Sequence, residues 1–213
     1  MKATITGILF TVVLSLQSNF IKLSPDDEQQ KTEFTYNVNG NAGDKTLVIT
    51  DLFSDLNIEG TSGSEIKIEA IGYEGLPEKA KGLKPLGGGG EENTGIGLSF
   101  NPNGSNISLS GVYRAADDAK YIIYIPKNMK LRIEDQGWRG GDINIKGLTN
   151  EVEAKTQVGD LSFEDVTGPI VAHTLSSDLK IDFNSLNQTS PSSITSTSGD
   201  LEITLPASVK GTF

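Results

Sequence analysis

Four aspartates carry the most visible chemistry of this sequence, because each stands at the same point of a repeated motif. The motif is a small residue, Asp, an apolar, a polar and an apolar residue. It places Asp142, Asp160, Asp178 and Asp200 at separations of 18, 18 and 22 residues. Such carboxylates can bind a backbone amide in a turn, ligate Ca²⁺, or cleave a glycosidic bond in pairs. The turn is favoured, because every repeat needs a corner whereas a catalytic residue is needed once.

The two chemical alternatives have weaker support. The chain lacks the dense Gly-Gly-x-Gly-x-Asp repetition of dedicated calcium solenoids. His173 is the only histidine, and its parity is opposite to that of Ala172, which predicts a solvent-facing strand residue and not a catalytic base. We therefore expect no catalytic residue, no cofactor and no metal site. Whether the ladder of these four aspartates binds a cation is left open.

Trp138 is the third residue with possible chemistry. It lies beside Arg139 in the glycine-rich stretch Gln136–Gly141. An exposed aromatic ring next to a guanidinium could stack on a sugar, whereas a buried one would cover the end of the core. The covering role is the favoured interpretation.

The elements that position these residues are short strands. A second alternating stretch lies between successive Asp motifs, so one repeat contains two strands and a corner at each end. Self-similarity at about 18 to 22 residues is typical of solenoid coils that bury their apolar faces on one another. The sequence therefore predicts an all-β fold, a β-solenoid, with a β-sandwich as the alternative. The predicted inward side chains are Ile143, Ile145, Val152, Ala154, Leu161, Phe163, Ile170, Ala172, Leu179, Ile181, Ile194, Leu201 and Ile203.

The chain divides into three predicted parts. Residues 1–18 have a single lysine followed by a short apolar run, which is typical of a secretory signal peptide. Residues 19–44 form a polar lead-in. Residues 45–213 form the solenoid, interrupted by loops at about 73–97 and 114–120, and we expect its C-terminal end to be truncated or uncapped.

Composition narrows the function classes. The formal net charge of −10 disfavours binding to nucleic acid or to an anionic membrane through a basic face. The absence of cysteine excludes disulfides and thiolate sites. An exported chain without cysteine fits a bacterial periplasm, cell surface or extracellular location, with no direct membrane insertion once the signal is removed.

Three stretches carry a resemblance to a known family. They are the strand-Pro-strand segment YIIYIPKNMKLRIE, the Gly-Asp-Ile/Leu-x-Ile/Phe repeats, and the final SGDLEITLPASVKGTF. Together they resemble the bacterial putative adhesin family of exported β-solenoid domains. The resemblance covers residues 121–213 well and residues 47–70 loosely. It implies a surface protein without established catalytic residues.

The sequence thus predicts a non-enzymatic, exported cell-envelope protein that acts as an adhesin or interaction scaffold with a protein or glycan ligand. Two alternatives stay open. One is a carbohydrate-active solenoid enzyme that uses carboxylates on one face. The other is an envelope sensor or regulatory domain.

Overall fold

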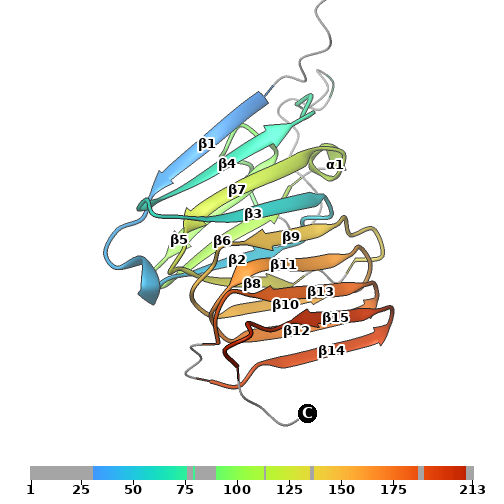
Figure 1. Cartoon of the computed structure of the whole chain (residues 1–213). Coiled ribbons are helices and arrows are strands. Elements are labelled where there is room, and N and C mark those ends of the chain that lie inside the picture. The colour runs from blue at the N-terminus through green and yellow to red at the C-terminus, as the bar shows by residue number, and fades with distance from the viewer. Residues whose placement is uncertain are drawn as a thin grey trace, which may run out of the picture.

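Alternating apolar and polar residues fold this chain into strands that stack in two facing sheets (Figure 1). The computed structural model describes residues 31–75, 79, 90–112, 114–134, 137–186 and 190–209. The predicted signal peptide, residues 1–18, lies outside this range. Within these residues no helix has the length and apolar character needed to span a membrane.

The strands are distributed between an eight-stranded and a seven-stranded sheet. In spatial order the first contains β1 (Lys31–Asn37), β4 (Glu65–Ile71), β7 (Lys120–Pro126), β3 (Asp55–Thr61), β9 (Ile143–Lys146), β11 (Leu161–Val166), β13 (Leu179–Phe183) and β15 (Leu201–Thr204). The second contains β14 (Ser193–Ser198), β12 (Ile170–Ser176), β10 (Val152–Thr156), β8 (Lys130–Glu134), β2 (Thr46–Thr50), β6 (Asn106–Gly111) and β5 (Leu98–Asn103). Two short helical turns, η1 (Ala42–Asp44) and α1 (Arg114–Asp117), complete the described elements.

The fold is a β-solenoid whose coils each give one strand to each sheet. We number the coils along the stack: coil 1 is β6 and β7, coil 2 is β2 and β3, coil 3 is β8 and β9, coil 4 is β10 and β11, coil 5 is β12 and β13, and coil 6 is β14 and β15. Strands of neighbouring coils pair in parallel and in register, as Leu161 does with Ile143 on one side and Leu179 on the other. Parallel stacking confirms the predicted solenoid over the alternative sandwich, and the corners bring equivalent residues into columns.

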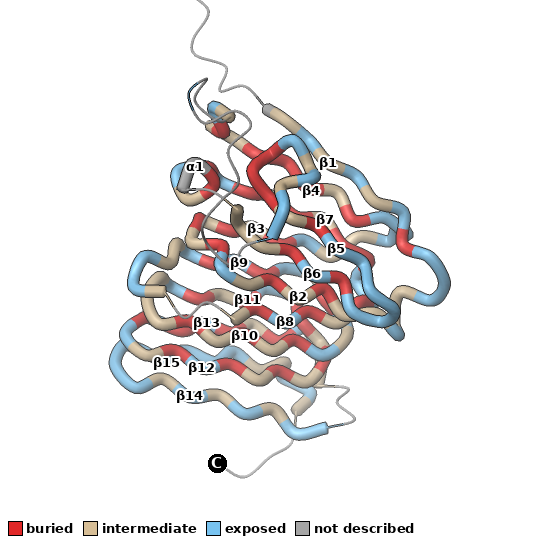
Figure 2. Tube along the Cα trace, turned by 180° about the vertical axis from the view of Figure 1, so that it is seen from behind, coloured by how far each residue is buried: buried red, intermediate tan, exposed pale blue. Residues whose placement is uncertain are grey.

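The core lies between the two sheets, and buried residues alternate with more exposed ones along most strands (Figure 2). The ten predicted inward residues from Ile143 to Ile181 are all buried. Tyr121 and Tyr124 fall on opposite faces of β7, so Tyr121 is buried while Tyr124 is half-buried. The Tyr121 hydroxyl donates to the carbonyl oxygen of Ile96 at 2.8 Å, and burial raises the pKa of Tyr121.

The stacking order departs from the order along the chain. Coil 2, which comes first in the sequence, lies between coils 1 and 3, so β3 pairs with β7 on one side and with β9 on the other. In the second sheet β2 lies likewise between β6 and β8. An early segment is therefore inserted between two later ones.

Antiparallel strands close the coil 1 end of the solenoid. β4 pairs antiparallel with β7, β1 with β4, and β5 with β6. Strand β1 lies within the segment taken from the sequence as a polar lead-in, and it enters the sheet because Phe34 and Tyr36 share one face. Their rings lie 4.9 and 5.0 Å from the ring of Phe100 on β5, centroid to centroid. Aromatic side chains thus cover the core at this end.

The coil 6 end is open in the described part of the chain. The registers align Leu201 with Leu179 and Ile203 with Ile181, as the inward prediction requires. Leu201 is nevertheless 47% exposed and Ile203 is 40% exposed, and Ile194 is only partly buried. These three side chains occupy the predicted inward positions but are not fully buried, because no described coil lies beyond coil 6.

Candidate functional site

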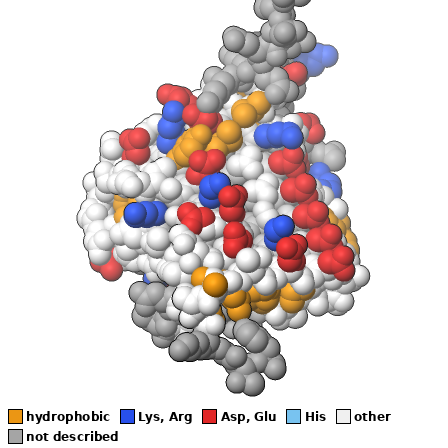
Figure 3. All heavy atoms as spheres, in the orientation of Figure 1, with side chains coloured by type: hydrophobic (Ala, Val, Ile, Leu, Met, Phe, Trp, Pro, Cys, Tyr) orange, Lys and Arg blue, Asp and Glu red, His pale blue; other side chains and the backbone are white. Residues whose placement is uncertain are grey.

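The repeated aspartates form a ladder along one side of the eight-stranded sheet. Each carboxylate except that of Asp200, the last in the stack, accepts a hydrogen bond from the backbone N–H of the next aspartate, at 2.8 to 3.2 Å. The series begins with Asp55 of coil 2 and continues through Asp142, Asp160, Asp178 and Asp200. Figure 3 shows a column of acidic side chains on this side of the molecule. We call these five residues the aspartate ladder.

The ladder confirms the turn interpretation and changes its detail. The amide that each carboxylate binds belongs to the next coil and not to the aspartate's own turn. Lys120 Nζ lies 3.1 Å from Asp55 Oδ2 at the coil 1 end, so a cation faces the first carboxylate. Among the described residues, no group of three His, Cys, Asp or Glu side chains could hold a metal ion. Its backbone hydrogen bonds make the ladder a column that connects successive coils.

The small residue before each aspartate is required by the same close stacking. A Cβ on Gly159 would collide with the carbonyl oxygen of Gly141, and one on Gly199 would collide with that of Ser177. Gly159 also has a φ of +85°, which side-chain-bearing residues rarely adopt. These corners thus hold neighbouring coils at backbone contact distance.

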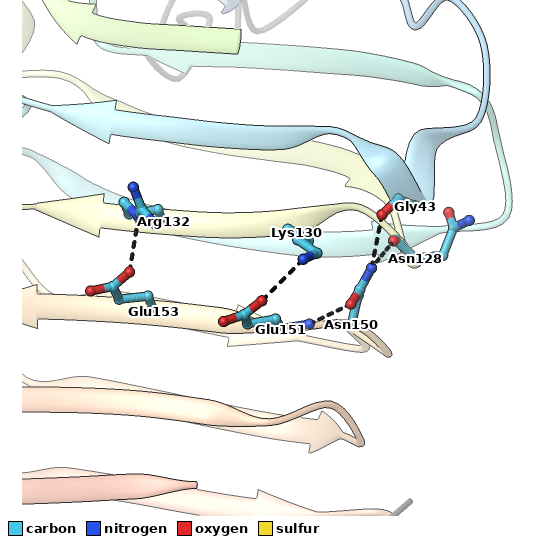
Figure 4. Close-up of polar contacts among 7 residues, drawn as sticks. All are labelled: Gly43, Asn128, Lys130, Arg132, Asn150, Glu151 and Glu153. Atoms are coloured by element: carbon cyan, nitrogen blue, oxygen red, sulfur yellow. Dashed lines mark hydrogen bonds and ion pairs between the residues drawn. The ribbon is translucent and has the colours of Figure 1, made fainter. Parts of the chain in front are cut away.

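A second column of polar contacts crosses the coils on the seven-stranded sheet (Figure 4). Asn150 Nδ2 donates to the carbonyl oxygens of Asn128 at 2.8 Å and Gly43 at 3.3 Å. Lys130 pairs with Glu151 at 3.1 Å and Arg132 with Glu153 at 2.9 Å, from one coil to the next. In these ion pairs, charged side chains of one coil neutralise those of the next.

Glu153 belongs to the same column and has two cationic neighbours. Its carboxylate accepts from Lys155 Nζ at 2.7 Å as well as from Arg132. The Lys155 ammonium is the main cause that holds the pKa of Glu153 below its ordinary value. A carboxyl group kept ionised in this way stabilises the face and is unsuited to donate a proton.

Trp138 lies where the connections of three stacked coils meet. Phe53 comes from the β2–β3 connection of coil 2, Asp117 and Asp118 from α1 and its end before β7, and Trp138 with Arg139 from the β8–β9 connection of coil 3. We call these five residues the Trp138 corner. Stacking brings Phe53, Asp117, Asp118 and Arg139 together, and Trp138 is the residue before Arg139 in the chain.

The corner is held in place by Phe53. The Phe53 ring lies so close to Gly137 that any Cβ there would collide with it. The Arg139 guanidinium carbon lies 5.3 Å from the centre of the same ring, within the range of a cation–π interaction. Arg139 Nη1 also lies 3.4 Å from Asp117 Oδ2. The buried Ser54 hydroxyl donates to the carbonyl oxygen of Ala116 at 2.5 Å, which ties coil 2 to α1.

Trp138 itself is 72% exposed, so the interpretation that it covers the end of the core is wrong. Phe34 and Tyr36 cover the closed end instead. Tryptophan is enriched among the residues that contribute most of the binding energy at protein interfaces. The other four residues of the corner line an open hollow of about 490 Å³. An exposed aromatic side chain is thus adjacent in the sequence to the Arg139–Asp117 ion pair, and the exposed Asp118 adds a second carboxylate to the hollow.

This arrangement can bind a ligand that has both an apolar face and hydroxyl or amide groups. A guanidinium offers several N–H donors in one plane, and carboxylates accept from hydroxyl groups. Pyranose sugars combine such hydroxyls with a C–H face that stacks on an indole ring. His173 is exposed on β12, as predicted, and belongs to another face.

Part of this site was missed by sequence reasoning. The segment 114–120 was expected to be a loop that interrupts the solenoid, and it supplies Asp117 and Asp118. Phe53 was not singled out, although a lone aromatic in the short connection Asp51–Ser54 is a signal that could have been used. Nothing in the sequence indicates that this connection stacks against residues 137–139.

The chain is similar to a known protein family and to solved structures. A family model described as Toastrack DUF4097 matches residues 44–212. A crystal structure of a putative cell adhesion protein from Clostridium sporogenes covers 83% of this chain and 100% of its own, at 10% identity and a TM-score of 0.42. One of a putative adhesin from Bacteroides fragilis covers 84% and 98%, at 14% identity and a TM-score of 0.30. No curated protein matches the sequence.

Proposed function

Because the chain belongs to the Toastrack DUF4097 family and folds as a β-solenoid, we propose that it is a non-enzymatic interaction protein of the bacterial surface that binds carbohydrate at the Trp138 corner. The single observation that carries the proposal is the 72% exposure of Trp138 beside the Arg139–Asp117 pair. Export is part of the proposal and rests on the signal-like sequence of residues 1–18.

Three features support a binding role over catalysis. The ladder aspartates accept backbone amides, so their carboxylates serve the coil corners. They stack along one side of a sheet and do not face one another across a cleft as glycosidase carboxylates do. The Arg139 guanidinium lies against the Phe53 ring and beside Asp117, so the corner gathers an aromatic ring and an ion pair on one surface.

The test is binding to an array of immobilised cell-surface glycans, followed by titration calorimetry with the retained glycan. Trp138→Ala is expected to weaken binding at least tenfold, which is about 1.4 kcal/mol, as for an aromatic anchor of an interface. Trp138→Tyr keeps an aromatic face and is expected to retain most of the affinity.

The controls separate binding from folding. Because Trp138 is exposed, Trp138→Ala should change the free energy of unfolding by less than about 0.5 kcal/mol. Lys180→Ala alters an exposed side chain of β13 far along the stack and should bind as the unmodified chain does. Equal glycan affinity of the Trp138→Ala variant and the unmodified chain would refute the proposed site.

A further inference from the structure

The end of the solenoid at coil 6 exposes a complete stacking surface. In the described part of the chain, β15 pairs only with β13 and β14 only with β12, so the outer edges of both strands carry unpaired backbone groups. Between these edges lie the partly buried Ile194 and the exposed Leu201 and Ile203. Figure 3 shows hydrophobic side chains gathered along this end. This surface therefore combines apolar side chains with strand edges whose backbone groups have no pairing strand.

This edge lacks the usual features that keep strands from pairing. Edge strands are commonly protected by lysine, proline or a bulge within the strand. β14 has the sequence SITSTS, without a charge or a proline. β15 has the sequence LEIT, and Glu202 is its single charge, with Lys180 Nζ at 3.4 Å. The edge is therefore competent to accept another strand on each sheet.

We propose that the occupant of this end is a second copy of the chain, related by a two-fold axis that passes through both sheets. Such an axis places β15 antiparallel to the partner's β15 and at the same time β14 antiparallel to the partner's β14. Both sheets then continue across the interface, and the apolar surfaces between them face each other.

Head-to-tail stacking does not satisfy the same conditions. The opposite end of the solenoid is closed by Phe34 and Tyr36 over Phe100. It is also staggered, because the eight-stranded sheet extends two strands beyond coil 1 and the seven-stranded sheet extends one. The coil 6 end is level in both sheets. Only the pairing of this end with itself joins two apolar surfaces and four unpaired strand edges.

Charge selects the register of the pair. Side chains directly opposite one another in an antiparallel pair point to the same face of the sheet. One residue of β15 must therefore lie opposite its own copy in the partner, with the two-fold axis midway between the two. A register centred on Glu202 would place two like charges opposite each other, which is unfavourable. A register centred on Ile203 places Ile203 opposite Ile203, Leu201 opposite Leu205, and Glu202 opposite Thr204. We therefore assign the centre to Ile203.

The absence of cysteine makes a sharp test possible, because any disulfide in a single-cysteine variant joins two chains. Under mild oxidation the Ile203→Cys variant is expected to become mostly disulfide-linked dimer, since the two Cβ atoms of a directly opposite pair lie about 5 Å apart. Glu202→Cys should cross-link poorly, and Ser108→Cys, exposed on β6, should report random collision. Preferred cross-linking of Glu202→Cys over Ile203→Cys would overturn the assigned register.

Sedimentation of the unmodified chain over a wide dilution series tests the interface itself. We expect a dimer that dissociates on dilution, and a monomeric Ile203→Lys variant with the circular dichroism spectrum of the unmodified chain. A chain that stays monomeric throughout, with Ile203→Cys no more reactive than Ser108→Cys, would overturn the proposal. Monomers whose β14 and β15 amides are protected from hydrogen exchange would also overturn it, because something else would then cover the edge.

Discussion

An aspartate inside the ladder connects coils through two hydrogen bonds, one made by its backbone N–H and one by its carboxylate. Its backbone N–H donates to the carboxylate of the preceding coil, and its own carboxylate accepts from the following one, as Asp160 does between Asp142 and Asp178. The sequence revealed the spacing of these residues and the need for a hydrogen bond at each corner. It could not reveal that the acceptor and the donor lie in different coils, because both stand in identical motifs.

Substitution of Asp160 separates hydrogen bonding from charge. Asp160→Asn keeps an oxygen that can accept the Asp178 amide and should leave the free energy of unfolding nearly unchanged. Asp160→Ala removes the acceptor and should lower it by about 1 kcal/mol. Urea denaturation measures both. If Asp160→Asn were as destabilising as Asp160→Ala and if Ca²⁺ raised the melting temperature of the unmodified chain alone, the ladder would be a cation site instead.

At the residue scale, Trp138 also marks the limit of sequence reasoning. A tryptophan in a glycine-rich connection has the same local sequence whether it is buried or exposed. Its neighbour Gly137 lies against the Phe53 ring, so the connection that carries Trp138 is placed by a residue of another coil. This contact joins residues about 84 positions apart, so it is a property of stacking.

At the scale of the element, the coil is the unit that the sequence specifies best. Alternation identified the strands of coils 3 to 5 and ten of their buried side chains, from Ile143 to Ile181, because each such strand has one face in the core and one in water. The same alternation is present in coil 6, where it produces exposed side chains. A pattern indicates which face a side chain occupies, but burial depends on the neighbouring coil.

The tight corner between coils predicts a large cost for one methyl group. Gly159→Ala combines an unfavourable positive φ with a collision against the Gly141 carbonyl, and we expect a loss of about 3 kcal/mol or more in the free energy of unfolding. Gly95 has a φ of +77° but open space around it. Gly95→Ala should therefore lower the free energy of unfolding only through the unfavourable positive φ of alanine, by about 1 to 2 kcal/mol.

Thermal or urea unfolding of the two variants isolates the collision, since the backbone terms are similar and cancel in the difference. Equal losses for Gly159→Ala and Gly95→Ala would mean that the coils separate easily at the corner. The close backbone approach would then contribute little to stacking.

At the scale of the whole molecule, the sequence predicts the solenoid but not the order of its coils. Residues 45–70 resemble the later repeats, and nothing in them indicates a place between coil 1 and coil 3. Every coil has apolar side chains on the inward side of both its strands, so the local sequence pattern is compatible with several stacking orders. The order is decided by contacts between segments 60 to 90 residues apart, such as β3 with β7 and β9.

The inserted coil predicts an order of protection during refolding. Coil 2 has both its neighbours only when residues 106–146 are in place, whereas coils 4 to 6 can add one after another. In pulsed hydrogen-exchange labelling, the amides of β2 and β3 should gain protection no earlier than those of β6 to β9. Protection of β2 and β3 before β8 would show that coil 2 folds alone.

This insertion also has a consequence for a chain that emerges from a ribosome or a membrane pore with its N-terminus first. Residues 46–61 leave early, but both of their neighbouring coils are present only after about 85 further residues have followed. They must stay unfolded during that interval, when their alternating apolar side chains are open to aggregation or to capture by a chaperone. The early segment that forms coil 2 thus remains unfolded until the later segments that flank it have emerged. Folding is completed when coil 2 is enclosed between coils 1 and 3.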